Sequence, residues 1–264
     1  MFIKTSISTS IIILVVLFAF ARCDAKVVPD SKAESELRKK ADSTRAPQKI
    51  SLTKENYLSF FKTYSKEHFT DTFLVHSEFG EIEIVLFANT PLHTANFIHL
   101  VKEEYFNDTW FHRVSANHVI QAGNNDDPET VKKRKAIGEY LLPAEALGEN
   151  HHFYGAVAAA RSYNNNPEKR SDPFEFYISL GEKYSLGQLS IIEDRYNLNL
   201  STEQKELYQN VGGSPHLDGE HTVFGTVIRG MSVVEEISRQ ETDSGEWPLK
   251  NIPIKIRIKS KKVL

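Results

Sequence analysis

The chain has almost no means of covalent cross-linking, since its 264 residues include a single cysteine, Cys23. No disulfide can form within the chain, so its folded part must be stable through its own hydrophobic core. The chain also lacks a strong charge of either sign, because 35 acidic residues nearly balance 32 lysines and arginines and leave a net charge of −3. Nucleic-acid and membrane-surface functions, which need a basic field, are therefore disfavoured.

The apolar run near the N-terminus, residues 11–20, is too short to span a bilayer comfortably, which takes roughly 20 apolar residues. Lys4 precedes this run, and a small-x-small pattern ends at Ala21. This layout is typical of a secretory signal peptide, so we predict a signal peptide over residues 1–21 with cleavage after Ala21. The mature chain is expected outside the cytoplasm, without membrane insertion.

Cys23 lies just past the predicted cleavage site and has two interpretations. It is a free thiol near the terminus, or it is the lipidated cysteine of a membrane-anchored bacterial lipoprotein. Arg22 disfavours lipidation, because such sites usually require a small residue directly before the cysteine. The chain that follows is polar and charged without an apolar stripe, which predicts a disordered linker over residues 22–50.

The rest of the chain fits one N-terminal helix and one domain of ordinary size. Thr53 and Glu55, followed by apolar residues at helical spacing, predict a capped amphipathic helix within residues 51–70. In the predicted domain, residues 71–264, Thr90 and Pro91 begin a second helix with a hydroxyl cap and a proline at its first position. Short strands are predicted at residues 73–75, 80–87, 110–114, 118–121, 154–160, 174–179, 222–228 and 254–258. Such a pattern favours a mainly β barrel capped by helices.

A stretch of about residues 181–213 interrupts the succession of strands. Ser185 with Gln188, and Ser201 with Gln204, each match a capping box, in which a serine and a glutamine satisfy the first backbone donors of a helix. We therefore predict a helical insertion with two short helices at residues 181–213.

Three motifs follow one another along the chain: Phe111-His112-Arg113, Gln121-Ala122-Gly123, and residues 217–225, Leu-Asp-Gly-Glu-His-Thr-Val-Phe-Gly. Together they resemble the signature of the cyclophilin family of peptidyl-prolyl isomerases, over about residues 73–259. The insertion and the residues just before the last motif are similar to those of bacterial extracytoplasmic members. The resemblance implies a closed eight-stranded antiparallel barrel with a helix at each end, and a protein of the bacterial periplasm.

The resemblance also implies an activity, the cis/trans isomerisation of X-Pro bonds in unfolded or extended polypeptides. Such an enzyme needs no nucleophile, metal or other cofactor, and a monomer is expected. Arg113 is the candidate that donates to the prolyl nitrogen as the amide twists. Carried over from the family, the substrate site contains Val119, Gln121, Tyr177, Leu217 and His221, with Gln121 holding the arginine. Ala160 and Arg161 would offer backbone hydrogen bonds to the peptide.

Four site residues, one of them Arg161, depart from the common pattern of the family. His118 replaces a phenylalanine on the pocket floor, Glu175 replaces a glutamine, Arg161 replaces an asparagine, and His216 replaces a tryptophan. We expect Glu175 to pair with Arg113 and hold it off the substrate. Protonation of His118, near its reference pKa of about 6.5, would weaken proline binding in mild acid. The alternative function is accordingly a catalytically weakened peptide-binding module or chaperone.

The remaining histidines and the basic cluster at residues 132–135 are given structural interpretations. His151 and His152 invite a zinc hypothesis, but adjacent histidines point apart and no supporting cysteine or HExxH spacing exists, so solvated loop histidines are expected. His112 is expected to be buried with its hydrogen bonds satisfied. The basic cluster is expected to be a charged loop.

Overall fold

The computed structural model describes residues 50–67, 70 and 72–259. The predicted signal peptide, Cys23 and the predicted linker up to residue 49 lie outside the described residues. No helix in the described part of the chain is both long enough and apolar enough to cross a membrane.

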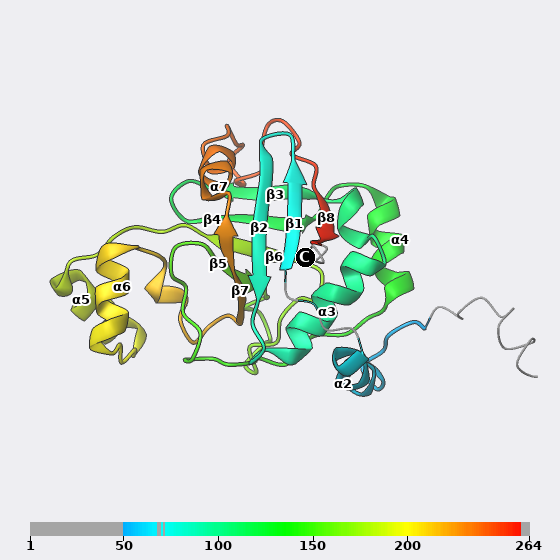
Figure 1. The fold of residues 1–264 in the computed structure, drawn as a ribbon, viewed down its shortest axis with the longest axis horizontal. Helices are drawn as coiled ribbons and strands as arrows, with labels where there is room; N and C mark the ends of the chain where they lie inside the picture. The colour runs from blue at the N-terminus through cyan, green and yellow to red at the C-terminus, as the bar shows by residue number, and fades with distance from the viewer. Residues whose placement is uncertain (1–49, 68–69, 71, 260–264) are drawn as a thin grey trace, which may run out of the picture. The chain divides into compact units, whose positions relative to one another are not determined.

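The centre of the fold is one eight-stranded sheet, in which every paired strand is antiparallel to its neighbour (Figure 1). Its spatial order is β3-β4-β6-β5-β7-β2-β1-β8. The strands are β1 (Thr72–Ser77), β2 (Gly80–Leu86), β3 (Trp110–Ser115), β4 (Val119–Asn124), β5 (Ala156–Ala159), β6 (Phe176–Ser179), β7 (Val223–Arg229) and β8 (Lys255–Ile258). The prediction of a mainly β fold with eight antiparallel strands is confirmed.

The sheet is strongly curled, so that β1 and β2 cross the direction of β3 and β4 (Figure 1). Its two ends meet through an isolated bridge between Trp110 and Pro253 and through the hydrogen bonds Phe111 N to Ile252 O, 2.9 Å, and Ile254 N to Thr109 O, 3.0 Å. No ladder joins β3 to β8 in the strand order. The structure therefore supports a curled, open sheet, and the closed barrel stays a prediction.

Alternation of side chains along each strand separates the two faces of the sheet. In β2, Ile82, Ile84 and Leu86 are buried in the main hydrophobic core, as the alternating sequence predicts. Aromatic rings fill the same core, and Phe97 contacts both Phe176 and Phe224. The opposite face of β4, β5 and β6 therefore carries side chains that do not belong to this core.

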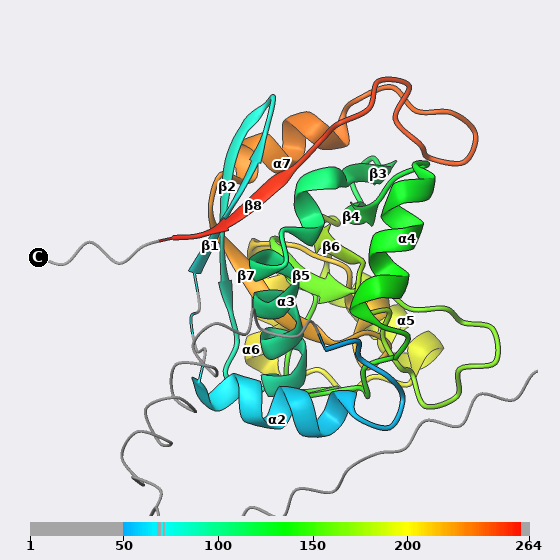
Figure 2. The same cartoon turned by 90° about the vertical axis from the view of Figure 1, so that its right-hand side faces the viewer.

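Six α-helices surround the sheet within the described residues. They are α2 (Tyr57–Glu67), α3 (Pro91–Lys102), α4 (Pro128–Ile137), α5 (Leu186–Tyr196), α6 (Thr202–Asn210) and α7 (Met231–Ser238), with two short 3-10 helices at Tyr105–Asp108 and Pro215–Leu217. Helix α2 lies across α3 (Figure 2), and its buried Tyr57 and Phe61 pack with Tyr140. The expected charged loop at residues 132–135 is wrong, because these residues belong to α4.

The caps predicted from the sequence form at the start of two helices and do not form at the start of a third. Ser185 and Ser201 both form the predicted capping boxes, at the first turns of α5 and α6. Thr90 makes no side-chain cap for α3. The carboxylate of Glu145 instead accepts from the backbone N–H groups of Leu92 and His93, at 3.0 and 2.9 Å. A carboxylate suits this position because the first turn of a helix carries unsatisfied donors and a positive dipole end.

Candidate active site

A cavity of about 360 Å³ lies on the face of the sheet opposite the main core. Ten of the eleven residues predicted for the site line it, and His216 is the exception. No pattern in the sequence points to the other three lining residues, Ser162, Tyr163 and Asp172. The full lining is Arg113, His118, Val119, Gln121, Ala160, Arg161, Ser162, Tyr163, Asp172, Glu175, Tyr177, Leu217 and His221.

Strand register explains why residues far apart in the sequence meet in this cavity. Arg113 on β3 pairs with Gln121 on β4, and Gln121 pairs in turn with Tyr177 on β6. Residues directly opposite each other in a sheet project to the same face. The three side chains therefore form one row across the sheet, and this row forms one side of the cavity.

Arg113 has an unexpected partner. Its Nε donates a 2.7 Å hydrogen bond to Oε2 of Glu246, a residue 133 positions later in the chain. The prediction that Gln121 holds the arginine is wrong, because Nε2 of Gln121 donates to Oε2 of Glu175, 2.8 Å away. Within the described residues, the two terminal nitrogens of Arg113 have no hydrogen-bond partner. They are free to donate to a molecule in the cavity.

Glu175 also departs from its expected contact. Nη2 of Arg134 on α4 lies 3.1 Å from its Oε1, and Nε2 of His112 lies 3.5 Å from its Oε2. Burial alone would raise the pKa of this carboxyl, but His112 and Arg134 outweigh that effect and hold the pKa at about 2. Glu175 is therefore ionised but directed at Arg134, and the expectation that it pairs with Arg113 is wrong.

His118 and His216 stack on each other at one end of the cavity, with ring centroids 5.4 Å apart. His118 lines the cavity, whereas His216 lies behind it and contacts Tyr196 at the end of α5, with centroids 5.9 Å apart. Burial lowers the pKa of both imidazoles, and the nearby Arg113 lowers that of His118 further. A neutral His118 therefore persists to lower pH than the reference value of about 6.5 implies.

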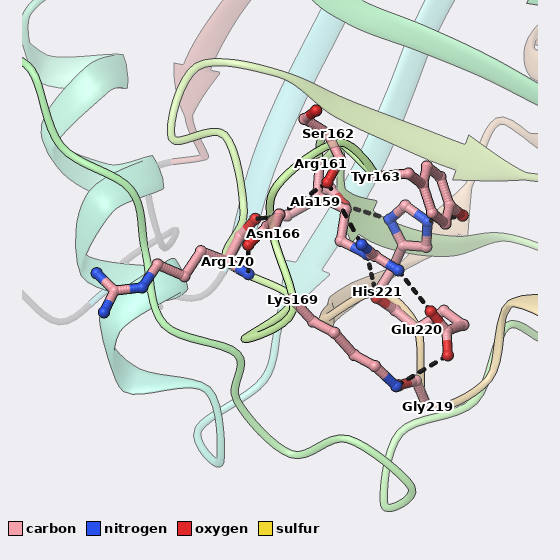
Figure 3. Close-up of polar contacts among 10 residues, drawn as sticks. All are labelled: Ala159, Arg161, Ser162, Tyr163, Asn166, Lys169, Arg170, Gly219, Glu220 and His221. Atoms are coloured by element: carbon pink, nitrogen blue, oxygen red, sulfur yellow. Dashed lines mark hydrogen bonds and ion pairs between the residues drawn. The ribbon is translucent and has the colours of Figure 1, made fainter.

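The opposite wall of the cavity is a polar cluster around Arg161 and His221 (Figure 3). The guanidinium of Arg161 donates to the backbone oxygen and the carboxylate of Glu220, and its Cζ lies 4.1 Å from the ring centroid of Tyr163. Lys169 donates to the other carboxylate oxygen of Glu220, at 2.8 Å. These contacts hold Arg161 against the protein, so its side chain is not free to reach a ligand.

His221 bridges this cluster and the strand β5. Its Nδ1 lies 3.1 Å from the carbonyl of Ala159, which can only accept, so Nδ1 carries the hydrogen. The neutral Nε2 then accepts from the hydroxyl of Tyr163, 2.7 Å away. Burial lowers the pKa of His221 to about 4, which keeps the ring neutral.

The backbone edge expected to bind a peptide is only partly available. The N–H of Ala160 donates to Glu175 O, and its carbonyl accepts from Asp172 N, at 3.0 and 2.8 Å. The prediction that Ala160 offers free backbone groups is therefore wrong. Among the described residues, neither the N–H nor the carbonyl of Arg161 has a hydrogen-bond partner, so the backbone of Arg161 remains an open edge.

Asp218 organises a buried network behind the cavity. It accepts from Nδ1 of His151 at 2.8 Å, from N and Nδ1 of His152 at 2.8 and 2.9 Å, and from the hydroxyl of Tyr208 at 2.6 Å. Nε2 of His152 lies 2.9 Å from the hydroxyl of Tyr177. Burial alone would raise the pKa of Asp218, but the histidine hydrogen bonds hold it at about 2. The expectation of solvated loop histidines is wrong, because His152 is fully buried.

His112 is buried, as expected, but its hydrogen bonds are not all satisfied. Nε2 faces Glu175, whereas the buried Nδ1 has no hydrogen-bond partner among the described residues.

The described residues contain no group of three or more His, Cys, Asp or Glu side chains arranged to hold a metal ion.

Fold and site together define a curled antiparallel sheet with a cavity of about 360 Å³, flanked by an arginine with free terminal nitrogens. The chain belongs to the cyclophilin-type peptidyl-prolyl cis-trans isomerase family, because the model of the family "Cyclophilin type peptidyl-prolyl cis-trans isomerase/CLD" matches residues 72–258, well over half of the chain. It is an isomerase by family.

Curated relatives are similar to this chain in sequence, and solved structures are similar to it in fold. A protein of Staphylococcus aureus (strain USA300) named for peptidyl-prolyl cis-trans isomerase activity is 28% identical over 182 residues, which cover 69% of this chain and 87% of that protein. A similarly named protein of Staphylococcus saprophyticus is 27% identical over the same shares. The fold is similar to that of a cyclophilin-type isomerase of Cryptosporidium parvum, with a TM-score of 0.52 and 20% identity, over 73% of this chain and 99% of that one. Another structure of that enzyme was obtained in the presence of the dipeptide Ala-Pro.

Proposed function

We propose that this chain accelerates the cis/trans isomerisation of X-Pro bonds in the cavity next to Arg113. Rotation about a peptide bond is opposed by about 18 to 20 kcal/mol, because the nitrogen lone pair is delocalised into the carbonyl. A catalyst must therefore favour the twisted amide, in which the lone pair is localised on nitrogen. The observation that carries the proposal is the pair of unoccupied terminal nitrogens on Arg113, beside the cavity.

In this proposal, Arg113 donates a hydrogen bond to the prolyl nitrogen as the bond rotates. A hydrogen bond to a charged group contributes about 1.5 to 3 kcal/mol, which corresponds to roughly ten- to a hundredfold in rate. The proline ring would occupy the apolar part of the cavity, which contains Val119, Tyr177 and Leu217. His118 and His221 would close its ends in their neutral forms, and His216 would support His118 from behind.

The substrate would bind as an extended segment beside the backbone of Arg161, because extended chains pair with open backbone edges. We propose proline-containing stretches of unfolded or extended exported proteins as the substrates, and a monomer as the working form. The sequence of residues 1–21 supports export, and a bacterial periplasm fits the resemblance stated above. A lipid anchor at Cys23 is the alternative to a freely diffusing protein. We also propose that the sheet closes fully into a barrel.

The isomerisation rate of a short Ala-Pro peptide, measured by exchange NMR, tests the activity. We expect catalysis by the wild type and a loss of roughly ten- to a hundredfold in kcat/KM for Arg113→Ala. Arg257→Ala is the matched control, since Arg257 is an exposed arginine that also pairs with a glutamate, Glu81. An Arg113→Ala protein as active as the wild type would exclude the proposed role.

The alternative function, a peptide-binding module or chaperone with weak turnover, is favoured by His118 in place of the family's phenylalanine. It predicts that the wild type shifts the NMR signals of the Ala-Pro peptide without accelerating its exchange. The same titration therefore separates the two functions.

A further inference from the structure

The contact between Arg113 and Glu246 is the feature of the site that neither the sequence motifs nor the family membership assigns. Glu246 lies in the segment between α7 and β8 and uses both carboxylate oxygens. Oε2 accepts from Nε of Arg113 at 2.7 Å, and Oε1 accepts from the hydroxyl of Ser115 at 2.6 Å. Arg113 and Ser115 are two residues apart on β3, so their side chains project to the same face.

The turn that carries Glu246 is fastened to the same strand by its backbone. The carbonyl of Glu246 accepts from the N–H of Val114 at 2.8 Å. Within the turn, Oδ1 of Asp243 accepts from the backbone N–H of Gly245 and of Trp247, at 2.8 and 2.9 Å. The ring of Trp247 packs against Trp110, with centroids 6.3 Å apart. The carboxylate of Glu246 is thus held in place from several directions.

Glutamate is an unfavourable choice for the backbone at this position. Its φ is +64°, in the left-handed region, where glycine is favoured and other residues lose about 1 to 2 kcal/mol. The ion pair does not offset this loss through stability, because its two side chains are 38% and 40% exposed and such pairs contribute roughly 0 to 1 kcal/mol. The two contacts that the carboxylate adds at this strained position, with Ser115 and with Arg113, both bring the turn to the strand that carries the arginine.

We propose that Glu246 is a positioning residue for the isomerase reaction, which fixes the plane of the Arg113 guanidinium so that its terminal nitrogens face the cavity. This inference rests on the proposed function of the cavity. A contact at Nε alone suits the role, since it orients the guanidinium and leaves both terminal nitrogens as donors. The hydrogen bond from Ser115 and the charge of Arg113 also lower the pKa of Glu246, so the carboxylate is ionised at neutral pH.

Two substitutions separate positioning from a structural role. Glu246→Gly removes the carboxylate but suits the positive φ, so the turn should fold at least as well as in the wild type. Glu246→Gln keeps an oxygen that can accept from Nε of Arg113 while removing the charge. We expect kcat to fall about tenfold for glycine and two- to threefold for glutamine, with KM within twofold of the wild-type value, because the proline-binding surface is unchanged. Glu81→Gln, which breaks a comparably exposed pair with Arg257, is the control and should leave kcat unchanged.

The order of the Arg113 side chain provides a readout independent of activity. The Nε–H signal of Arg113, assigned in 15N NMR spectra by its absence in Arg113→Lys, should be protected from solvent exchange in the wild type. It should lose this protection in Glu246→Gly and keep part of it in Glu246→Gln. An unchanged Nε–H signal together with an unchanged kcat in Glu246→Gly would overturn the proposal, and so would an increase in kcat, which would mean that Glu246 restrains the arginine. If the wild type proves inactive while the Nε–H signal behaves as expected, the proposed isomerase function fails and the ordering of Arg113 by Glu246 stands.

Discussion

The hydroxyl of Tyr177 lies 2.9 Å from Nε2 of His152, and both side chains are buried. Through this contact the wall of the cavity is joined to Asp218, and through Asp218 to Tyr208 on α6. The helical insertion is therefore part of the support for the cavity, because one of its side chains completes the buried network.

Removing the charge of Asp218 should destabilise the protein. Asp218→Asn retains an oxygen acceptor but loses the carboxylate that accepts from two histidines and a tyrosine, so we expect the free energy of unfolding to fall by about 2 to 4 kcal/mol. Urea denaturation at pH 7 measures the change. Asp194→Asn, on the exposed face of α5, is the matched control and should change stability by less than about 0.5 kcal/mol. Equal denaturation midpoints for Asp218→Asn and the wild type would contradict this account of the network.

Replacing His118 by phenylalanine should strengthen proline binding and remove a pH effect. The larger apolar ring adds roughly 1 kcal/mol of contact, so kcat/KM is expected to rise about fivefold. Because burial lowers the pKa of His118, wild-type activity should stay level as the pH falls to about 6.5 and decline only at lower pH, as the imidazolium forms. His118→Phe should lack this decline, whereas His76→Phe, on the exposed side of β1, should behave like the wild type. Parallel acid limbs in His118→Phe and the wild type would place the responsible group elsewhere.

Substituting Glu175 should not release Arg113, since these two residues are not paired. Glu175→Gln removes the carboxylate that contacts the partly buried Arg134, so we expect a loss of about 1 to 3 kcal/mol of stability and no rise in kcat. The exchange assay and urea denaturation measure the two effects. A clear increase in kcat would instead support the original idea that Glu175 restrains the catalytic arginine.

The low pKa of His221 should make stability fall in mild acid. Above about pH 6.5 the ring is neutral in both folded and unfolded chains; below it, only the unfolded chain takes up the proton until the pH approaches about 4. A pKa that moves from 6.5 to about 4 corresponds to a loss of about 3 kcal/mol at most across that window. Thermal or urea unfolding of the wild type and of His221→Gln from pH 7 to pH 4 tests this. The variant should lose less stability, because effects of the other titrating groups are common to both proteins, and identical pH profiles would exclude His221 as the cause.

Local patterns in the sequence were sufficient for the strands, and the family resemblance supplied most of the cavity residues. Alternating apolar residues mark strands such as β2, because every second side chain must reach the core. The motifs around Arg113 and Gln121 place both side chains on neighbouring strands, and the structure brings them into one row. Helix α4 was missed because its charged residues carry no apolar stripe. What this helix packs against is visible only in the tertiary contacts of Arg134 and its neighbours.

By itself the sequence determined the order of the strands along the chain, because alternation is a short-range pattern, and its motifs identified the family, from which most of the cavity residues were carried over. The tertiary structure alone decided the partners: Glu246 for Arg113, Arg134 for Glu175, and Asp218 for His152. These pairs are 133, 41 and 66 residues apart in the chain. No local pattern links such residues, since an ionisable side chain pairs with whichever opposite charge the folded chain brings within hydrogen-bonding distance.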